Sequence, residues 1–294
     1  MAQKLINRPS LFGFSVQTMS IVEPRIDRFS ADPTTLSNAG VGQIRLGDPV
    51  VQMAGGTIVR YVPGGTAILG FAASGQNNVL PRSIASAPLL LDAAGNPLVS
   101  VYLADALTIF TGQTSSAPIQ SQVLQLHDLQ YAIPDALAPA PVVTNVGVAG
   151  TTSYSYTISA LTGMGESMPS PAGTTATGNA VLSSANYNSL VIATTLQAAS
   201  FNIYRAGLLI GNVPVISGIA TSFKDIGQAA QVGVPATINT TGWLVNNTAS
   251  ATQVLEIRSI DTKPVLPFIS TTNVGAVMFA ITAAKSQVQN LAGV

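Results

Sequence analysis

Apolar and polar residues alternate most regularly in the middle of the chain, at residues 153–161. Four apolar side chains of this stretch fall on one side of an extended chain, and they are Tyr154, Tyr156, Ile158 and Ala160. Serine and threonine fill most of the other side. A period of two is typical of a β-strand with one buried face. A second aromatic and β-branched run follows at residues 201–205, so this block predicts a compact β-sandwich.

The first part of the chain consists of short apolar runs with glycine or proline turns between them. The runs are residues 50–53, 57–62, 67–71, 98–103, 107–110 and 123–126. Glycine pairs at 55–56 and 64–65 separate the first three. Strands of four to six residues joined by such turns predict the hairpins of a small barrel or sandwich.

After Gly242 the same pattern returns, with apolar runs at residues 243–245, 254–258 and 273–281. A segment of about 50 residues is too short for a core of its own, so we expect it to complete the first domain. Linker-like segments at 136–141 and 235–242 mark the boundaries. The prediction is an all-β protein with a discontinuous, small β-barrel-like domain (residues 1–137 and 242–294). An immunoglobulin-like sandwich is inserted at residues 138–241.

Composition narrows the class of protein. Only 8% of the 294 residues are charged, and the net charge is zero. The usual charged share is about 25%, so this chain would either lie in a membrane or cover its surface with other subunits. The prolines and the polar residues 270–273 interrupt the apolar window 264–284, which excludes a spanning helix. Lysine and arginine stand singly, which argues against nucleic acid. We expect neither nucleic acid nor membrane insertion.

Groups that could carry catalysis or hold a metal are sparse. His127 is the only histidine and stands beside Asp128, but neighbours on a strand point to opposite faces. A zinc site needs three or four nitrogen or sulfur ligands, and one histidine without cysteine cannot supply them. Calcium bound by Asp92, Asn96 and Asp105 stays open, as does a glycosidase carboxylate pair. We predict no enzyme, no catalytic residue, no cofactor and no metal.

The residues that make the middle block recognisable are 152–161, Gly165-Glu166-Ser167, 186–190, 199–205 and 223–225. With them the block resembles the fibronectin type III and immunoglobulin-like domains that recur in tailed-phage virion proteins. The resemblance implies a seven-stranded sandwich. It also implies inward or edge packing by Tyr154, Tyr156, Ile158, Phe201, Ile203 and Tyr204. The strand at 190–193 lacks the tryptophan common in that family, so a smaller core is expected there.

The flanking segments 36–40, 47–50, 64–71 and 277–281 resemble the structural cement, or head decoration, proteins of tailed phages. This resemblance implies a β-barrel-like domain that binds the outside of an icosahedral shell, usually as a dimer or trimer. The expected function is therefore that of a capsid decoration protein on the outer surface of a phage head. It would be made in the host cytoplasm. Its partners would be the major capsid protein and further copies of itself.

Two sets of residues are candidates for contacts. The set proposed to touch the capsid or other subunits is Arg25, Asp27, Arg28, Phe29, Pro264 and Phe268. The set for a second hypothesis, a host-surface adhesin that binds glycans, is Glu166 and Tyr187. We expect Tyr187 to be the most exposed tyrosine. A tail or baseplate component is the third hypothesis.

Overall fold

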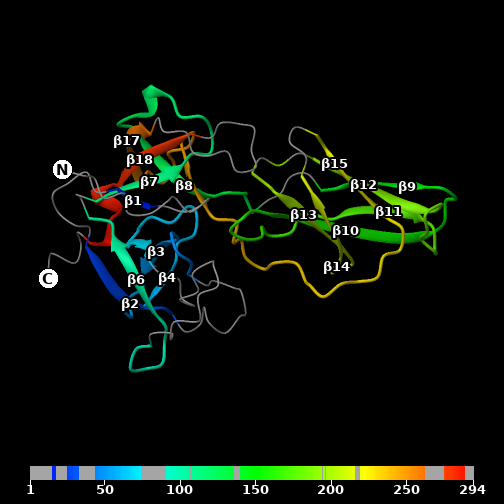
Figure 1. The fold of residues 1–294 in the computed structure, drawn as a ribbon, viewed down its shortest axis with the longest axis horizontal. Coiled ribbons are helices and arrows are strands. Elements are labelled where there is room, and N and C mark those ends of the chain that lie inside the picture. Colours follow the sequence, from blue (N-terminus) through cyan, green and yellow to red (C-terminus); the bar gives the residue numbers. More distant parts are fainter. Residues whose placement is uncertain are drawn as a thin grey trace. The chain divides into compact units, whose positions relative to one another are not determined.

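The computed structural model describes residues 15–17, 25–32, 44–73, 91–105, 108–135, 140–193, 195, 197–215, 219–261 and 275–288. Antiparallel strands are the main regular structure of these residues, at 47% against 4% helix, and the predicted all-β class is confirmed. The chain divides into two compact units (Figure 1). The described residues up to Gln130 and from Trp243 onward form unit 1, and Tyr131–Gly242 form unit 2.

A five-stranded sheet in unit 1 has the order β2-β6-β5-β3-β4. Its strands are β2 (Ile26–Ser30), β3 (Pro49–Gln52), β4 (Ile58–Arg60), β5 (Gly70–Ala72) and β6 (Leu98–Leu103). Every second side chain of β6 is buried, as the period of two requires. The sheet curls, because Ala31, which follows β2, bridges to Ile58 in β4.

A six-stranded sheet, in the order β1-β7-β18-β17-β8-β16, combines strands from both ends of the chain. Its strands are β1 (Ser15–Gln17), β7 (Ile109–Gln113), β8 (Leu126–Tyr131), β16 (Trp243–Asn246), β17 (Leu255–Asp261) and β18 (Ala276–Ile281). Strand β18 pairs with both β7 and β17. The rings of Phe110 and Phe279 in this sheet lie 4.4 and 6.0 Å from Phe71 in the other sheet, so the two sheets share an aromatic core.

The expected strand at residues 123–126 is wrong. A 3₁₀ helix at Gln120–Gln122 comes first, and Leu124 has a φ of 63°. A residue in this left-handed region ends the extended pairing, so β8 begins only at Leu126.

A buried ion pair joins the two chain segments of unit 1. The Asp48 carboxylate lies 3.1 Å from Nε of Arg60 and accepts a 2.9 Å hydrogen bond from Nε1 of Trp243. The Arg60 guanidinium lies 5.3 Å from the centroid of the Trp243 ring, and the centroid of the Tyr61 ring lies 5.7 Å from that of Trp243. Burial raises the pKa of the Asp48 carboxyl, and the charge of Arg60 opposes that shift. Burial also raises the pKa of Tyr61 to about 12.

Unit 2 is a sandwich of two sheets. The four-stranded sheet has the order β11-β10-β13-β14, and the three-stranded sheet has the order β15-β12-β9. The strands are β9 (Val142–Val146), β10 (Thr152–Leu161), β11 (Gly173–Gly178), β12 (Tyr187–Ile192), β13 (Ser200–Arg205), β14 (Leu208–Pro214) and β15 (Thr221–Asp225). Buried residues of both sheets form one core: Tyr156, Ile158, Ala160, Leu190, Ile192, Phe201, Ile203 and Ile210.

The two ends of unit 2 are hydrogen-bonded to each other. The backbone N–H of Ala132 donates to the carbonyl of Gly242 at 2.8 Å. The Asn239 side chain donates to the carbonyl of Ile133 at 2.6 Å, and the N–H of Ile133 donates to Oγ1 of Thr241 at 3.1 Å. The chain therefore enters and leaves the sandwich at adjacent points, which is the geometry of an inserted domain. We call this end of the sandwich its base.

Because every pairing in the sandwich is antiparallel, alternate connections gather at the opposite end. Four connections meet there, namely residues 147–151, 179–186, 206–207 and 226–228. We call this end the tip.

Candidate functional site

The N-terminal candidate residues lie on an edge strand. Strand β2 pairs with β6 from Ile26 to Ser30. Phe29 packs against the core of unit 1, whereas the side chain of Arg28 is exposed. Arg25 and Asp27 form a 2.7 Å ion pair at the surface. Arg25, Asp27 and Arg28 are thus the accessible members of this set. The other two candidates, Pro264 and Phe268, lie outside the described residues.

Glu166 holds the sandwich together at its base. Its Oε1 accepts hydrogen bonds from the side chains of Ser159, Asn202 and Tyr204. Its backbone N–H and carbonyl are both hydrogen-bonded to Thr240, near the end of the unit. Burial, and then the hydrogen bond donated to Glu166, raise the pKa of Tyr204 to about 12. The carboxylate of Glu166 therefore serves the fold of its own unit.

Tyr187 lies on the other sheet and at the other end. It begins β12, where it pairs with Val146, the last residue of β9. Its ring is half-buried and lies 5.1 Å from the ammonium of the exposed Lys224. Glu166 instead follows the base end of β10, where it bridges to Leu161. The structure does not bring the two residues of the glycan hypothesis together, so they do not form one binding site.

His127 and Asp128 face different surroundings, as expected for neighbours on a strand. The Asp128 carboxylate accepts hydrogen bonds from three consecutive backbone N–H groups, at residues 251–253. The His127 ring is buried without a hydrogen-bond partner for either nitrogen. Within the described residues, no three His, Cys, Asp or Glu side chains are grouped to hold a metal. The described helices are also too short to cross a bilayer.

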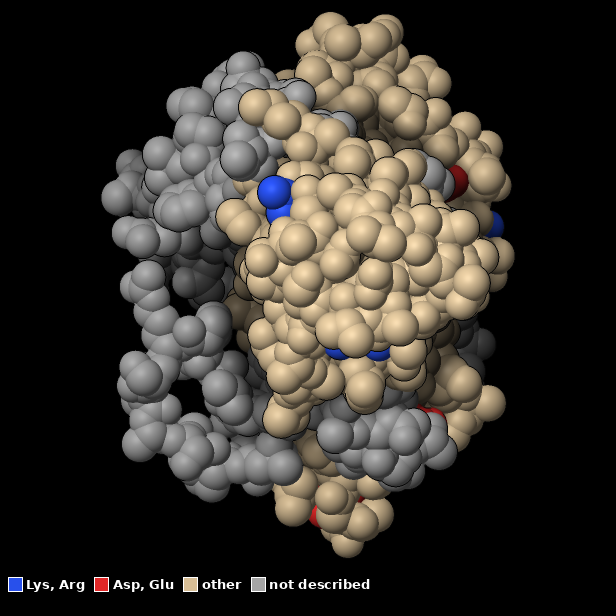
Figure 2. All heavy atoms as spheres, turned by 90° about the vertical axis from the view of Figure 1, so that its right-hand side faces the viewer, with Lys and Arg blue, Asp and Glu red and all other residues tan. Residues whose placement is uncertain are grey.

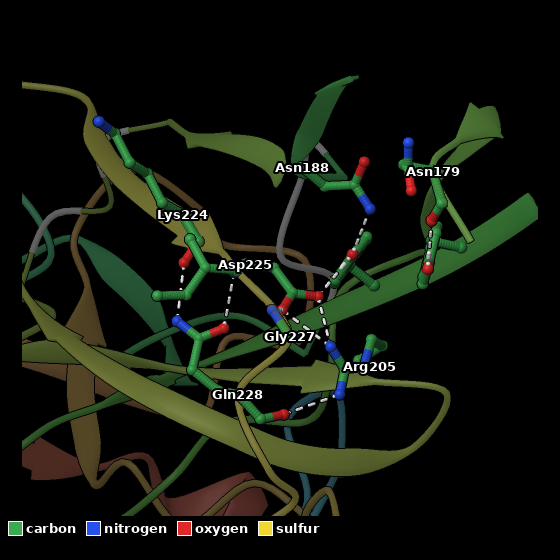
Figure 3. A network of polar contacts seen from close by, with 10 residues as sticks. Asn179, Asn188, Arg205, Lys224, Asp225, Gly227 and Gln228 are labelled. Carbon is green, nitrogen blue, oxygen red and sulfur yellow. Dashed lines mark hydrogen bonds and ion pairs between the residues drawn. The ribbon is translucent and has the colours of Figure 1, made fainter. Parts of the chain in front are cut away.

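A buried polar layer underlies the tip of the sandwich (Figure 3). The Asp225 carboxylate is fully buried, and both of its oxygens lie 2.8 Å from Nη1 of Arg205. It also accepts hydrogen bonds from the Tyr156 hydroxyl at 2.7 Å and from the Gly227 N–H at 2.9 Å. The Asn188 amide donates to the same hydroxyl at 2.7 Å. Burial raises the pKa of Tyr156. This layer ties strands of both sheets to the connection that follows β15.

The remaining members of the layer fix the exposed connection itself. Nη2 of Arg205 donates to the carbonyl of Gln228 at 2.8 Å, which links the end of β13 to residues 226–228. The Gln228 side chain accepts from the Ile226 N–H at 2.9 Å and donates to the Lys224 carbonyl at 2.8 Å (Figure 3). This connection is therefore fixed by hydrogen bonds from Arg205 and Asp225 of the sandwich and by the side chain of its own Gln228.

Two asparagines fix the connections on the other side of the tip. The Asn186 side chain accepts a 2.8 Å hydrogen bond from the Val148 N–H. The Asn179 side chain donates to the Val148 carbonyl at 3.3 Å and accepts from the Val181 N–H at 2.9 Å. Gly147 has a φ of 98°, and a Cβ there would lie 2.3 Å from the Ala185 carbonyl oxygen. Only glycine fits this close approach.

These ordered connections present aliphatic side chains to solvent. The exposed fractions are 68% for Val148, 73% for Val181 and 42% for Ile226. We call these three residues the tip patch. Figure 2 looks onto this end of the sandwich, where the spheres are almost all tan and charged atoms are few. Connections are usually polar, so an ordered, apolar and nearly uncharged tip is suited to contact with a partner.

The signal for the tip patch was present in the sequence, where Val148 and Val181 stand in turn-like segments beside glycine, alanine and asparagine. It was missed because an apolar residue in a short loop has the same pattern as the end of a buried strand.

Comparison with known proteins identifies no relative. No protein-family model, no curated protein and no solved structure matches the chain.

Proposed function

We propose that this protein is a non-enzymatic structural protein of a phage virion, specifically a decoration protein that binds the outside of the head. The observation that carries the proposal is the inserted sandwich, whose entry and exit are hydrogen-bonded at Ala132 and Gly242. One β unit would bind the shell, and the sandwich would point away from it and leave its tip accessible.

Strand pairing in the sandwich supports the immunoglobulin-like part of the proposal. In immunoglobulin variable domains one sheet contains strands G, F, C and C′, and strand B pairs with E in the other. The order β14-β13-β10-β11 matches the first sheet, and the pair β9–β12 matches the second. The departures are that no strand within the described residues takes the place of A, and that β15 lies beside β12 where strand D would stand.

The low charge also fits a protein whose surface is covered by other subunits. Burying a charged group costs several kcal/mol unless it is well paired, and this chain has few such groups to desolvate. Contacts between neutral surfaces depend only weakly on salt. A protein that binds the assembled shell, and not free capsid subunits, stabilises the shell by mass action.

The test is to mix the purified protein with undecorated, expanded heads and with tails of the phage that encodes it. Co-sedimentation with heads, and density repeated on the head lattice in electron microscopy, are the expected results. Ordered density on tails alone would favour a tail or baseplate component. Absence of binding to heads would refute the decoration role.

The tip patch favours a second candidate function, attachment to the host surface. In antibody variable domains, the B–C and F–G connections lie at the antigen-binding end. By the strand matching above, residues 147–151 and 206–207 are the equivalent connections, and both are at the tip. Adsorption of the purified protein to host cells should fall when Ile226 is changed to Asp, whereas Lys224→Ala is the control. Equal adsorption by the wild type and Ile226→Asp would exclude the tip.

A further inference from the structure

A pocket of about 370 Å³ lies on the six-stranded sheet of unit 1, and none of the residues considered above as a contact lines it. Glu256 and Arg258 of β17 line it, together with Leu126 of β8. Gln253, Thr282 and Lys285 line it as well. Three charged side chains meet here, in a chain whose charged residues are few.

One wall of the pocket is built on unusual backbone. Gln253 has a φ of 53°, which non-glycine residues rarely adopt. Its N–H donates to the Asp128 carboxylate at 2.7 Å, and its carbonyl accepts from the Thr282 hydroxyl at 3.1 Å. Two partners therefore hold this residue in a strained conformation. Strain of this kind is concentrated at functional sites.

Arg258 is set out of register. Ile257 pairs with Phe279 and Ser259 pairs with Met278, so Arg258 is an extra residue with no counterpart on β18. Such a β-bulge turns a side chain in a new direction and is common beside binding sites. The guanidinium is half-exposed and lies 3.2 Å from Oε1 of Glu256. The bulge thus directs a cation to the pocket.

The backbone of Lys285 is fixed by hydrogen bonds to residues outside the pocket. Its carbonyl accepts a hydrogen bond from the Ile68 N–H at 2.8 Å. The next residue, Ser286, is buried and donates to the Ala104 carbonyl at 2.6 Å. The backbone of Lys285 is therefore anchored to the five-stranded sheet, while the side chain faces the pocket. The backbone at Lys285 is therefore fixed before an anion binds, and only the side chain has to be ordered on binding.

We propose that this pocket binds a carboxylate carried on a polypeptide, with Lys285 and Arg258 as the cations that contact it. Glu256 neutralises one of the two cations, so the pocket keeps one net positive charge and takes one carboxylate. The aliphatic atoms of Leu126 pack against the methylene groups that carry the carboxylate. A volume of about 370 Å³ accommodates a glutamate side chain with its neighbouring backbone. The proposal is independent of the virion assignment.

The test uses two probes of equal size, N-acetylglutamate α-amide and N-acetylglutamine α-amide, titrated into the full-length protein and followed by NMR. The glutamate probe should shift the backbone amide signals of Gln253, Arg258 and Lys285, and the glutamine probe should bind at least about 10-fold more weakly, since a charge-assisted hydrogen bond is lost. Lys285→Ala should weaken the glutamate probe by about 10-fold. Lys224→Ala removes an exposed lysine in unit 2 and is the matched control.

Glu256→Gln distinguishes the proposal from adsorption to any surface cation. Removing this carboxylate frees Arg258, so binding of the glutamate probe should become up to about 5-fold tighter, the range expected for an exposed ion pair. Equal binding of the two probes, no signal shifts at tens of millimolar, or unchanged affinity in Lys285→Ala would each overturn the proposal. Weaker binding in Glu256→Gln would show that the glutamate is itself part of the recognition, and would likewise contradict it.

Discussion

In the described part of the chain, each unit contains one buried ion pair, and the two pairs stabilise different parts of the structure. In unit 1, Asp48 joins Arg60 and Trp243, which are 12 and 195 residues away in sequence. In unit 2, Asp225 joins Arg205, only 20 residues away, and the N–H of Gly227. The first pair connects the early strands to the segment that returns after the insertion. The second fixes a connection at the tip.

This difference shows that a similar ion pair can have two roles. In unit 1 it joins two segments of the chain into one domain, and in unit 2 it fixes the backbone of an exposed connection. A discontinuous domain needs interactions that form only when both of its segments are present, and the Trp243 contact is of that kind. An exposed connection needs interactions that hold its backbone so that its side chains can face outward. Loss of the first should open a whole unit, and loss of the second should release only one end.

The largest effect is expected for Trp243→Ala. The side chain is fully buried, and its loss removes the ring contacts with Tyr61 and Arg60 together with the hydrogen bond to Asp48. Truncations of this size cost about 3–5 kcal/mol of unfolding free energy. Hydrogen-exchange mass spectrometry should show faster exchange throughout unit 1, with unit 2 unchanged.

Trp243→Phe is the matched variant, since it keeps an aromatic ring but removes the N–H donor. We expect a loss of about 1–3 kcal/mol, because the buried Asp48 then lacks one partner. If Trp243→Ala accelerated exchange equally in both units, the view that this contact closes unit 1 alone would be wrong.

A smaller and more local effect is expected for Asp225→Asn. The substitution removes the charge that pairs with Arg205, whose side chain is 23% exposed. Because water reaches that guanidinium, the cost should lie below the 3–5 kcal/mol of a fully buried pair, at about 2–3 kcal/mol. Exchange should accelerate at residues 226–228 and at the end of β13 before it does in the rest of the sandwich. Uniform acceleration across unit 2 would show that the polar layer supports the whole core.

The comparison extends to alkaline pH. The pKa of Tyr61 in unit 1 and of Tyr204 in unit 2 is raised to about 12, from an ordinary value of 10.0. A raised pKa means that the unfolded chain loses its proton first. The stability contributed by each neutral phenol is therefore complete below pH 10 and is lost as the pH rises toward 12.

Replacing Tyr61 or Tyr204 by phenylalanine should reduce the alkaline loss of stability by different amounts in the two units. Tyr61→Phe should flatten the alkaline loss of stability in unit 1 more than Tyr204→Phe does in unit 2, because Tyr156, whose pKa is also raised, remains in the sandwich. Calorimetric midpoints of both variants at a series of pH values from about 9 to about 12 measure this. Equal flattening in the two units would show that Tyr156 does not contribute.

Sequence patterns predicted the parts of the fold that repeat with a period. The alternation at Tyr156 and Ile158 correctly identified β10 and its buried face. Strand β11 was not predicted, because Gly-Thr-Thr-Ala-Thr-Gly contains no apolar alternation and is defined only by its pairing with β10. The predicted insertion, 138–241, compares with a compact unit at Tyr131–Gly242.

The features that organise the candidate sites depend on contacts between distant residues. Nothing in the neighbourhood of Trp243 indicates that its N–H meets Asp48, which is 195 positions earlier. The bulge at Arg258 likewise follows from the register of β17 on β18 and not from local composition. Asp225 was recognisable as part of a sandwich motif, but its pairing with Arg205, which is 20 positions earlier, required the fold.

The smallest effect on stability is expected at the tip patch. The double variant Val148→Ser, Ile226→Ser changes side chains that face solvent, and such changes usually alter unfolding free energy by less than about 0.5 kcal/mol. The hydrogen bonds of Asn186, Gln228 and Asp225 go to backbone groups of these connections, so slow exchange at the tip should persist. Retention on a hydrophobic-interaction column should fall, because two aliphatic groups are removed from the surface. A loss of more than about 1 kcal/mol of unfolding free energy would mean that these side chains pack within the sandwich. The tip would then be part of the core of unit 2, and the contrast with the ion pair that joins the segments of unit 1 would be wrong.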